Sequence, residues 1–436
     1  MDNTVEAVAI KKAFRRLVGF LALMMFCAVM DRVNVGFAAL SMNKDLGLSS
    51  AAFGFGAGLF SLGYLLFEIA SNLILLKVGA RRWLARIMVT WALLSMATSL
   101  ASGPASFYAL RFALGVAEAG FLPGVMVYLG YWFPGSHRAR INAVFLLAMP
   151  VGQSVSALLS GLILNLDGLL GIAGWQWLFV LEGLPSLVIG IATWFYLTDR
   201  PADAGWLLPD ERAALETMVT REKAQFGKID NNGLMQVFCN PTVLSFGLIY
   251  SAISIVLTGV PLWLPQIVRT LGLSYGTVGL VAALPPLAGA VVMVLWGRSS
   301  DRRKERIWHI FAAMGLCSFG WLLAACFVSY GYGGTVLLIG GMVLANGGVL
   351  AASAIFWTLP SQALSGRAAA TGIALISAMG NVGSTIGPLL VGHLRDTTQG
   401  FALPFLFMVL VAIASGALLP LISGGTHQAG FKPETP

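Results

Sequence analysis

The sequence predicts an all-α membrane protein in which twelve transmembrane helices form two pseudo-symmetric six-helix bundles. Hydrophobic residues make up 57% of the 436 positions and charged residues only 11%, whereas soluble globular proteins carry roughly 25% charged residues. Twelve apolar runs are long enough to cross a bilayer. One long polar interval, residues 198–240, separates the first six runs from the last six. Composition, span count and this division together predict the fold class.

The predicted spans follow the apolar runs in chain order. They cover residues 17–40, 51–74, 83–102, 105–130, 140–164, 174–197, 242–268, 275–297, 307–329, 334–357, 368–392 and 402–423. The first run follows basic residues, as a signal peptide would, but it is too long for one and contains Asp31, so we expect it to be retained. Residues 1–198 are predicted to form the first bundle, 199–240 a cytosolic loop with a short surface helix starting at Pro209, and 241–436 the second bundle with a short tail.

The two predicted bundles repeat each other weakly. HRARINAVFLLAMPVGQ follows the fourth span and GRAAATGIALISAMGNVG follows the tenth, with comparable placement of basic, small, Met and amide residues. Related halves of this kind are typical of secondary transporters.

Basic residues predict the orientation of the chain. If the N-terminus is cytosolic, all but five of the 27 Lys and Arg residues fall on the cytosolic side. The exceptions are Arg32 and Arg111 within spans and Lys44, Arg269 and Arg395 outside. This asymmetry is the positive-inside pattern, so we expect both termini in the cytosol. The net charge of +8 is then a topology signal, and no nucleic-acid partner is expected.

Cysteines and histidines predict neither a disulfide nor a metal site. The four cysteines lack ligand spacing, and the histidines fall in loops or at span edges: Cys27, Cys239, Cys317, Cys326, His137, His309, His393 and His427. No HExxH motif occurs, and no His stands near a buried Ser or Cys. The sequence therefore does not predict an intramembrane enzyme.

Six ionisable residues fall well inside predicted spans, all in the first half: Asp31, Arg32, Glu68, Arg111, Glu118 and Glu182. Such residues are costly in a bilayer unless they are paired or face a wet cavity, and they mark transport or proton pathways. Arg111 and Glu118 are seven residues apart, so they share one helix face and stand about 10 Å apart along the axis. Because they cannot satisfy each other fully, we expect Asp31 and Arg32 to complete a four-charge cluster.

Most of these residues also admit a structural interpretation. Asp31 and Arg32 form either a neutralised pair that sets helix packing, with Asn34 bonded to Asp31, or a protonatable carboxylate beside an anion-attracting guanidinium. The helical stripe through Tyr64 and Glu68 favours a helix contact for Glu68 and a cavity position for Tyr64. Glu182 is expected to act as a polar clamp between helices.

Short basic motifs occupy the loops between spans two and three and between spans eight and nine. KVGARRW holds Gly79, Arg81 and Arg82, and GRSSDRRKERIW holds Gly297, Asp301, Arg302 and Arg306. With twelve spans in two halves, these loops resemble those of the major facilitator superfamily. The first copy departs from the family pattern, with Asn72 at its glycine position and Leu76 at its aspartate position. The resemblance implies that the loops latch the bundles in one conformation.

Longer motifs narrow this resemblance. DRVNVGFAAL, RFALGVAEAGFLPG, YWFP and FVLEGLPS followed by YLTDRPADAGWL resemble the anion:cation symporter family, in particular bacterial permeases for tartrate, phthalate and hydroxyphenylacetate. The resemblance covers essentially the whole chain. It implies that Asp31 and Glu118 carry protons and that Arg32 and Arg111 are functional cations. It also implies a substrate cavity lined by four further residues: Tyr64, Gln153, Trp357 and Asn381.

The predicted function is proton-coupled uptake of a small organic anion, an aromatic carboxylate or a hydroxy-dicarboxylate such as tartrate, by a monomer in the bacterial inner membrane. Protonation of Asp31 and Glu118 is expected to free arginine charge for the substrate. The expected partners are the carboxylate and the lipid bilayer, with protons as coupling ion and no cofactor or metal. Two alternatives stay open, a drug or metabolite:proton antiporter and a nutrient sensor that does not transport. The exporter signature Gly-x-x-x-Gly-Pro is absent from span five, and its nearest match, Gly383–Gly387–Pro388, lies in span eleven.

Overall fold

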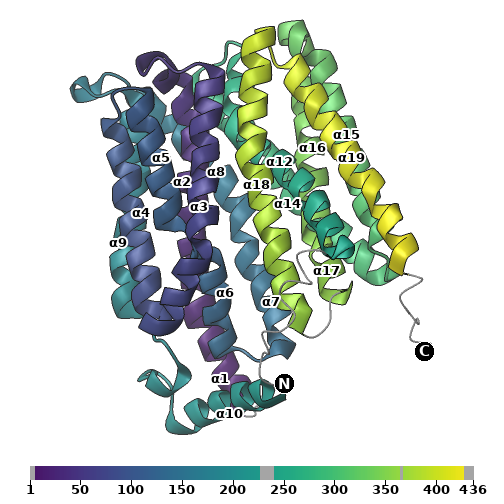
Figure 1. Cartoon of the computed structure of the whole chain (residues 1–436). Coiled ribbons are helices and arrows are strands. Elements are labelled where there is room, and N and C mark those ends of the chain that lie inside the picture. The colour runs from purple at the N-terminus through teal and green to yellow at the C-terminus, as the bar shows by residue number, and fades with distance from the viewer. Residues whose placement is uncertain (1–4, 226–239, 364–366, 427–436) are drawn as a thin grey trace.

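The computed structural model describes residues 5–225, 240–363 and 367–426. All regular secondary structure in these ranges is helical. Twelve helical stretches are long and apolar enough to cross a membrane, which confirms the predicted span count. Figure 1 shows them as two groups side by side, with α1 and the end of α19 at the lower end. We call that the terminal end and the opposite one the distal end. Cys239 and His427 lie outside the described residues.

The first half starts with a continuous helical segment that is longer than predicted. It runs from α1 through a π-helical turn, Phe14–Val18, into α2. The helices of this half are α1 (Val5–Ala13), α2 (Gly19–Asp45), α3 (Ser50–Val78), α4 (Ala80–Ala97), α5 (Pro104–Glu118), α6 (Phe121–Trp132), α7 (Gly135–Leu146), α8 (Ala148–Ile163) and α9 (Gly174–Tyr196).

The predicted surface helix is present as α10 (Pro209–Gln225), which lies beside α1 at the terminal end (Figure 1). Lys12 of α1 forms an ion pair with Glu211 of α10, with 2.6 Å between Nζ and Oε1. The helices of the second half are α12 (Pro241–Arg269), α13 (Tyr275–Ala282), α14 (Leu284–Arg303), α15 (Ile307–Phe327), α16 (Thr335–Phe356), α17 (Thr358–Ala363), α18 (Arg367–Thr398) and α19 (Ala402–Thr426).

Three predicted spans are interrupted where the apolar pattern gives no sign of a break. The fifth divides into α7 and α8 at Leu147. The fourth span divides into α5 and α6 at Gly120, whose φ of +83° is in the left-handed region that favours glycine. The eighth divides into α13 and α14 just before Pro285 and Pro286. These prolines lie in the first turn of α14, where a backbone N–H has no partner within the helix, so its absence costs nothing. Glu118 is consequently the last residue of its helix.

The two halves meet through close helix pairs on the distal side. α3 packs against α18, α2 against α12, and α8 against α13. A Cβ atom added at Gly54 or Gly392 would overlap the backbone of the opposite half, and one at Gly58 would lie 2.5 Å from the Thr385 carbonyl oxygen. Small residues allow such backbone approach between membrane helices. The distal side is therefore closed by main-chain contacts.

Asp396, near the end of α18, adds a polar contact to this closure. Its carboxylate accepts hydrogen bonds from the free N–H groups of Ser50 (2.9 Å) and Ala51 (2.7 Å) at the start of α3. A carboxylate at a helix N-terminus is stabilising because it satisfies these donors and opposes the helix dipole. Asp396 thus joins the two halves at the distal end.

Replacing Asp396 with alanine is expected to make distal opening more frequent, by about fivefold if the lost cap is worth about 1 kcal/mol. Labelling of a cysteine at cavity residue Ser384 by an impermeant maleimide, in a cysteine-free background, measures this. Asp45→Ala is the matched control, because Asp45 accepts a bond from Trp175 within its own half. Equal labelling of both variants would contradict the expected role of Asp396.

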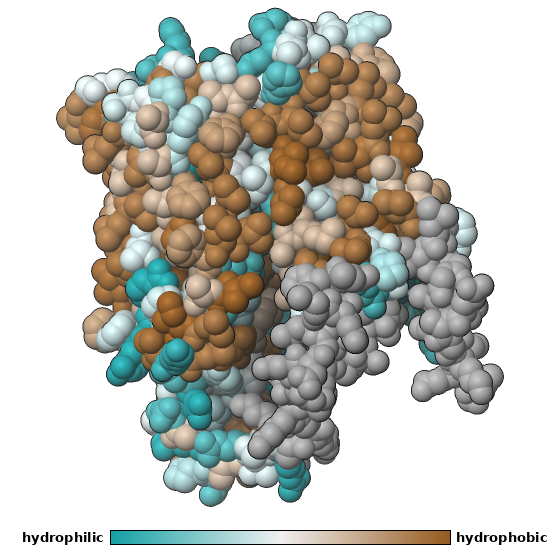
Figure 2. All heavy atoms as spheres, in the orientation of Figure 1, coloured by the Kyte–Doolittle hydropathy of each residue, from teal (hydrophilic) through white to brown (hydrophobic). Residues whose placement is uncertain are grey.

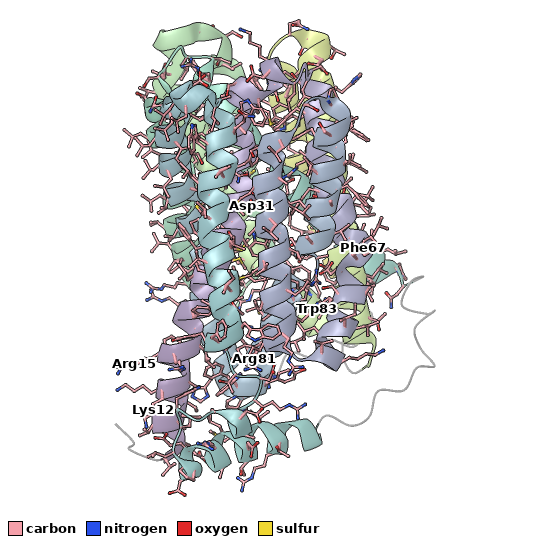
Figure 3. The ribbon with its side chains drawn as sticks, turned by 90° about the vertical axis from the view of Figure 1, so that its left-hand side faces the viewer. Lys12, Arg15, Asp31, Phe67, Arg81 and Trp83 are labelled. Atoms are coloured by element: carbon pink, nitrogen blue, oxygen red, sulfur yellow. The ribbon has the colours of Figure 1, made fainter. Side chains whose placement is uncertain are left out.

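The surface matches a bilayer environment. Figure 2 shows brown apolar residues over most of the flank and teal polar residues gathered at the terminal end. Figure 3 shows Lys12, Arg15 and Arg81 at that end, whereas Asp31 lies at mid-height within the bundle. This arrangement leaves Asp31 at membrane depth.

Candidate functional site

A cavity of about 280 Å³ lies between the two halves, on the terminal side of the α3–α18 closure. α2, α3, α5 and α8 line one wall, and α12 and α18 line the other. Its polar wall residues are Arg32, Ser61, Tyr64, Glu68, Arg111, Gln153, Tyr250, Ser254, Thr258, Ser377, Asn381 and Ser384. An apolar cavity with a few convergent polar groups is the usual form of a small-molecule site.

Arg32 lies on the cavity wall and is paired with Glu118. Its Nη2 and Nε atoms are 2.6 Å and 2.8 Å from Glu118 Oε1. The Arg32 side chain is 41% exposed, whereas that of Glu118 is fully buried behind it. The Arg32 guanidinium also lies 5.4 Å from the ring centres of Phe60 and Tyr64. A substrate anion that reaches Arg32 therefore competes with Glu118 for it.

Asp31 points away from Arg32, because adjacent helical residues are turned by about 100°. It is buried, accepts a short hydrogen bond from Ser95 of α4, and lies 3.4 Å from the Asn34 amide. The bond from Asn34 was expected, and the structure shows it. Oδ2 of Asp31 has no hydrogen-bond partner among the described residues. Asp31 is thus held by neutral donors inside the first half.

Arg111 has two buried donor atoms without an acceptor in the part of the chain that the structure describes. It is 3% exposed and lines the cavity, with its guanidinium 4.9 Å from the centre of the Phe60 ring. Within the described residues, its buried Nε and Nη1 atoms have no hydrogen-bond partner. An unsatisfied buried donor costs about 1–3 kcal/mol, and a charged one costs more. A bound anion would remove this cost.

The four charges that were expected to cluster interact electrostatically, but only Arg32 and Glu118 are in direct contact. Arg32 and Glu118 make a direct ion pair, but Asp31 bonds to Ser95 and Asn34, and Arg111 has no ion-pair partner in the described chain. The prediction treated Asp31 and Arg32 as one unit, whereas the helix turns them toward different neighbours. The structure consequently separates a paired cation from an unpaired one.

The second half contributes Asn381, as expected. Its Nδ2 atom donates to Glu68 Oε2 at 3.3 Å, and both residues line the cavity. Glu68 therefore makes a helix contact, but the contact joins the two halves rather than two neighbouring helices of the first. Tyr64 and Gln153 also lie on the cavity wall, where they were predicted.

Trp357 is one layer behind the cavity and does not line it. The wall at this place is Tyr250, and Trp357 packs edge-on against it with 4.6 Å between ring centres. Tyr250 and the hydroxyls of α12 and α18 line the cavity but were not among the residues assigned to it from the sequence. A helical stripe through Ser377, Asn381 and Ser384 was the signal that could have indicated them.

Glu182 is outside the cavity and acts as the predicted clamp. Ser160 of α8 donates to its Oε1 atom at 2.7 Å, which joins α8 to α9. Its Oε2 atom has no hydrogen-bond partner in the described ranges. Glu182 therefore serves the packing of the first half in this structure.

The first basic loop receives its carboxylate from elsewhere in the chain. Asp199, just beyond α9, accepts a 2.8 Å hydrogen bond from the backbone N–H of Arg81 and caps α4. Gly79 has a φ of +97°, a conformation that other residues rarely adopt. Leu76 stands where the family motif has an aspartate, and Asp199, which follows the sixth span, supplies a carboxylate to this loop instead. Arg82, beside Arg81, is exposed.

The second basic loop is also held locally. Arg306 pairs with Asp301 at 2.6 Å and donates to Ser300 at 2.9 Å. Arg302 is exposed on α14, the helix that also contains Gly297, and its side chain has no hydrogen-bond or ion-pair partner within the described residues. Among the described residues, none of these loop contacts reaches the opposite half.

Glu305, in this loop, lies between two spans. Burial alone would raise the pKa of its carboxyl, but hydrogen bonds from the His309 ring and from the backbone N–H groups of Trp308 and His309 outweigh it and lower the pKa. A carboxyl group whose pKa is lower in the folded protein than in the unfolded chain stabilises the fold at pH values above the unfolded-state pKa. This stabilisation is lost as the pH falls through the folded-state pKa.

We therefore expect Glu305→Gln to lower the melting temperature at neutral pH, with the difference from the wild type shrinking below about pH 4. Thermal unfolding in detergent at several pH values measures it. Glu216→Gln on the exposed face of α10 is the control and should match the wild type throughout. A difference in melting temperature between Glu305→Gln and the wild type that grows toward low pH would overturn the expectation.

Comparison with known proteins gives consistent matches. The family model described as Major Facilitator Superfamily matches residues 21–388. A protein of Agrobacterium vitis named as a tartrate transporter is 42% identical over 99% of this chain and 98% of its own. The quinolone resistance transporter of Acinetobacter baumannii is 36% identical over 94% of this chain and 93% of its own. Among solved structures, an inward-facing, unoccupied bacterial homologue of the human lysosomal transporter Spinster has a TM-score of 0.77, with 16% identity, 99% coverage of this chain and 100% of that chain.

Proposed function

Because this chain belongs to the Major Facilitator Superfamily, we propose that it is a proton-coupled symporter that takes up a small organic carboxylate across the bacterial inner membrane. Membership makes the chain a multi-pass membrane transporter rather than an enzyme. The observation that carries the proposal is the Arg111 guanidinium at the cavity wall, whose Nε and Nη1 atoms have no acceptor within the described residues. The tartrate name of close relatives supports an organic anion as the cargo.

Anion binding is assigned to Arg111 with help from Arg32. A carboxylate accepts paired hydrogen bonds from one guanidinium, and these are about twice as strong as neutral bonds. The Arg111 guanidinium lines the cavity and can present a donor to the anion there, while its buried Nε and Nη1 atoms have no acceptor within the described residues. Gln153 and Asn381, on opposite walls, suit the hydroxyl groups or second carboxylate of a hydroxy-dicarboxylate. The cavity chemistry therefore favours that class over a purely aromatic acid.

Coupling is assigned to Glu118, with Asp31 as a second proton carrier. While Glu118 is ionised it holds Arg32. When Glu118 binds a proton, Arg32 becomes available to the anion, and so proton and anion bind cooperatively. Reciprocal coupling of this sign is what symport requires. The membrane potential contributes about 2.3 kcal/mol per net charge per 100 mV, so it drives a monoanion with two protons but not a dianion with two.

The proposed orientation places the closed distal side outward, and the proton gradient, not this conformation, sets the direction of net flux. With both termini in the cytosol, that side faces outward and the cavity lies toward the cytosol. The proposed cycle breaks the Asp396–α3 contact to admit substrate and remakes it before release. The Glu68–Asn381 contact crosses the cavity and would be exchanged for substrate contacts during this movement.

A second candidate is proton-driven export, favoured by the quinolone resistance name of one relative. It uses the same cavity with the opposite direction of net flux. Proteoliposomes with independently set pH and voltage separate the two. Accumulation of tartrate or another carboxylate under an inward proton gradient supports symport. Export of substrate driven by the same inward gradient supports antiport. Absence of any proton-driven flux of a carboxylate or a quinolone, with specific binding retained, would leave the sensor alternative and overturn both transport proposals.

A further inference from the structure

A second hollow of about 320 Å³ lies at the terminal end of α14, apart from the cavity between the halves. Leu295, Arg298, Ser299, Arg302 and Arg303 line it, and none of them lines the central cavity. Spacings of three and four residues place these side chains along one side of the helix. We call this feature the arginine hollow.

The three arginines of the hollow carry uncompensated charge. Within the described residues, their side chains have no hydrogen-bond or ion-pair partner. The acidic groups nearby are already engaged, since Asp301 pairs with Arg306 and Glu305 bonds to His309 at 2.6 Å. The hollow therefore presents guanidinium donors without protein acceptors, a strong arrangement for binding a phosphate.

An apolar track leads from the membrane into the arginine hollow. Leu287, Val291 and Leu295 are 53%, 57% and 60% exposed and fall on the same face as Arg298 and Arg302. Arg298 stands about 16 Å along the axis from Leu287, close to half the thickness of the hydrocarbon core. The charged hollow therefore ends a lipid-facing stripe at headgroup height.

A tryptophan marks the same level on the neighbouring helix. Trp308 of α15 is 62% exposed and lines an adjoining hollow that shares Ser299 and Arg303 with the arginine hollow. Exposed tryptophans are enriched at membrane–water interfaces, where the ring sits among headgroups. Its position gives independent support for placing the arginines at the interface.

We propose that the arginine hollow binds the phosphate of an acidic phospholipid, whose acyl chains lie along the exposed face of α14. Net negative charge distinguishes this ligand from zwitterionic lipids, because the described lining of the hollow has three cations and no carboxylate. Basic juxtamembrane residues contribute about 1 kcal/mol each toward anionic lipid, which corresponds to roughly fivefold in affinity per arginine.

Native mass spectrometry of the full-length protein tests this with phosphatidylglycerol and phosphatidylcholine at equal concentrations. The wild type should retain phosphatidylglycerol preferentially. Arg298→Gln should weaken that binding by roughly fivefold, and the variant with Arg298→Gln, Arg302→Gln and Arg303→Gln should lose the preference. The control combines Lys11→Gln, Arg15→Gln and Arg221→Gln, which removes the same charge from exposed positions elsewhere and should leave binding unchanged.

Three outcomes would overturn the proposal. The triple arginine variant could keep the wild-type preference, or the control could lose as much binding as that variant does. Inorganic phosphate could displace phosphatidylglycerol completely at equal concentration, which would make the site one for free phosphate. Retained phosphatidylcholine binding and an unchanged melting temperature show that a variant is folded, so loss of the preference then supports the lipid site.

Discussion

Replacing Arg111 with glutamine is expected to reduce carboxylate uptake efficiency by about 100-fold. Two charge-assisted hydrogen bonds to the anion, each worth about 1.5 kcal/mol or more, would be lost. Initial rates in proteoliposomes over a range of substrate concentrations measure the change. The variant should bind substrate poorly even without a proton gradient, because the loss concerns the anion and not the proton.

Stability gives this experiment its control. Arg111 is buried with unsatisfied donors, so the neutral glutamine should fold at least as stably as the wild type. Arg86→Gln tests for a general effect of arginine removal, since Arg86 lies over the Trp83 ring away from the cavity. Normal uptake by Arg111→Gln would remove Arg111 from the anion site.

Replacing Glu118 with glutamine is expected to abolish proton-driven accumulation while sparing substrate exchange. Glutamine keeps an oxygen within reach of Arg32 but can no longer release a proton or hold the guanidinium by charge. Arg32 should then remain available to the anion at all pH values. Uptake against a gradient and counterflow of labelled substrate, measured on the same vesicles, distinguish the two activities.

Glu182→Gln is the matched control for this result. Glu182 is equally buried in the first half, but it contacts Ser160 and does not line the cavity. Its variant should keep proton-driven accumulation if it folds. Unchanged accumulation by Glu118→Gln, or a loss in Glu182→Gln equal to that in Glu118→Gln at equal stability, would contradict the assigned proton path.

The spans could be predicted because a bilayer requires long apolar helices, a constraint that is visible in composition alone. Helical spacing also placed Arg111 and Glu118 on one face of α5, and the motif resemblance placed Tyr64, Gln153 and Asn381 at the cavity. These features depend on one helix at a time or on a pattern shared by a family.

Pairing between helices could not be predicted in the same way. Arg32 contacts Glu118 while its neighbour Asp31 contacts Ser95, and the choice depends on how α2 is rotated against α4 and α5. Tyr250 lies in front of Trp357 for the same reason. A local sequence window holds no information on such rotations, because they are set by the packing of all neighbouring helices.

The contacts that Asp199 and Glu211 make with the first half affect the order in which the chain is completed during synthesis. Both residues follow the sixth span. Asp199 nevertheless caps α4, and Glu211 pairs with Lys12 near the start of the first half. Because domains form as the ribosome releases them, the first half can close its terminal end only after residue 211 has emerged. By then none of the second-half spans has been made, so the first six helices can pack together before the helices of the second half are synthesised.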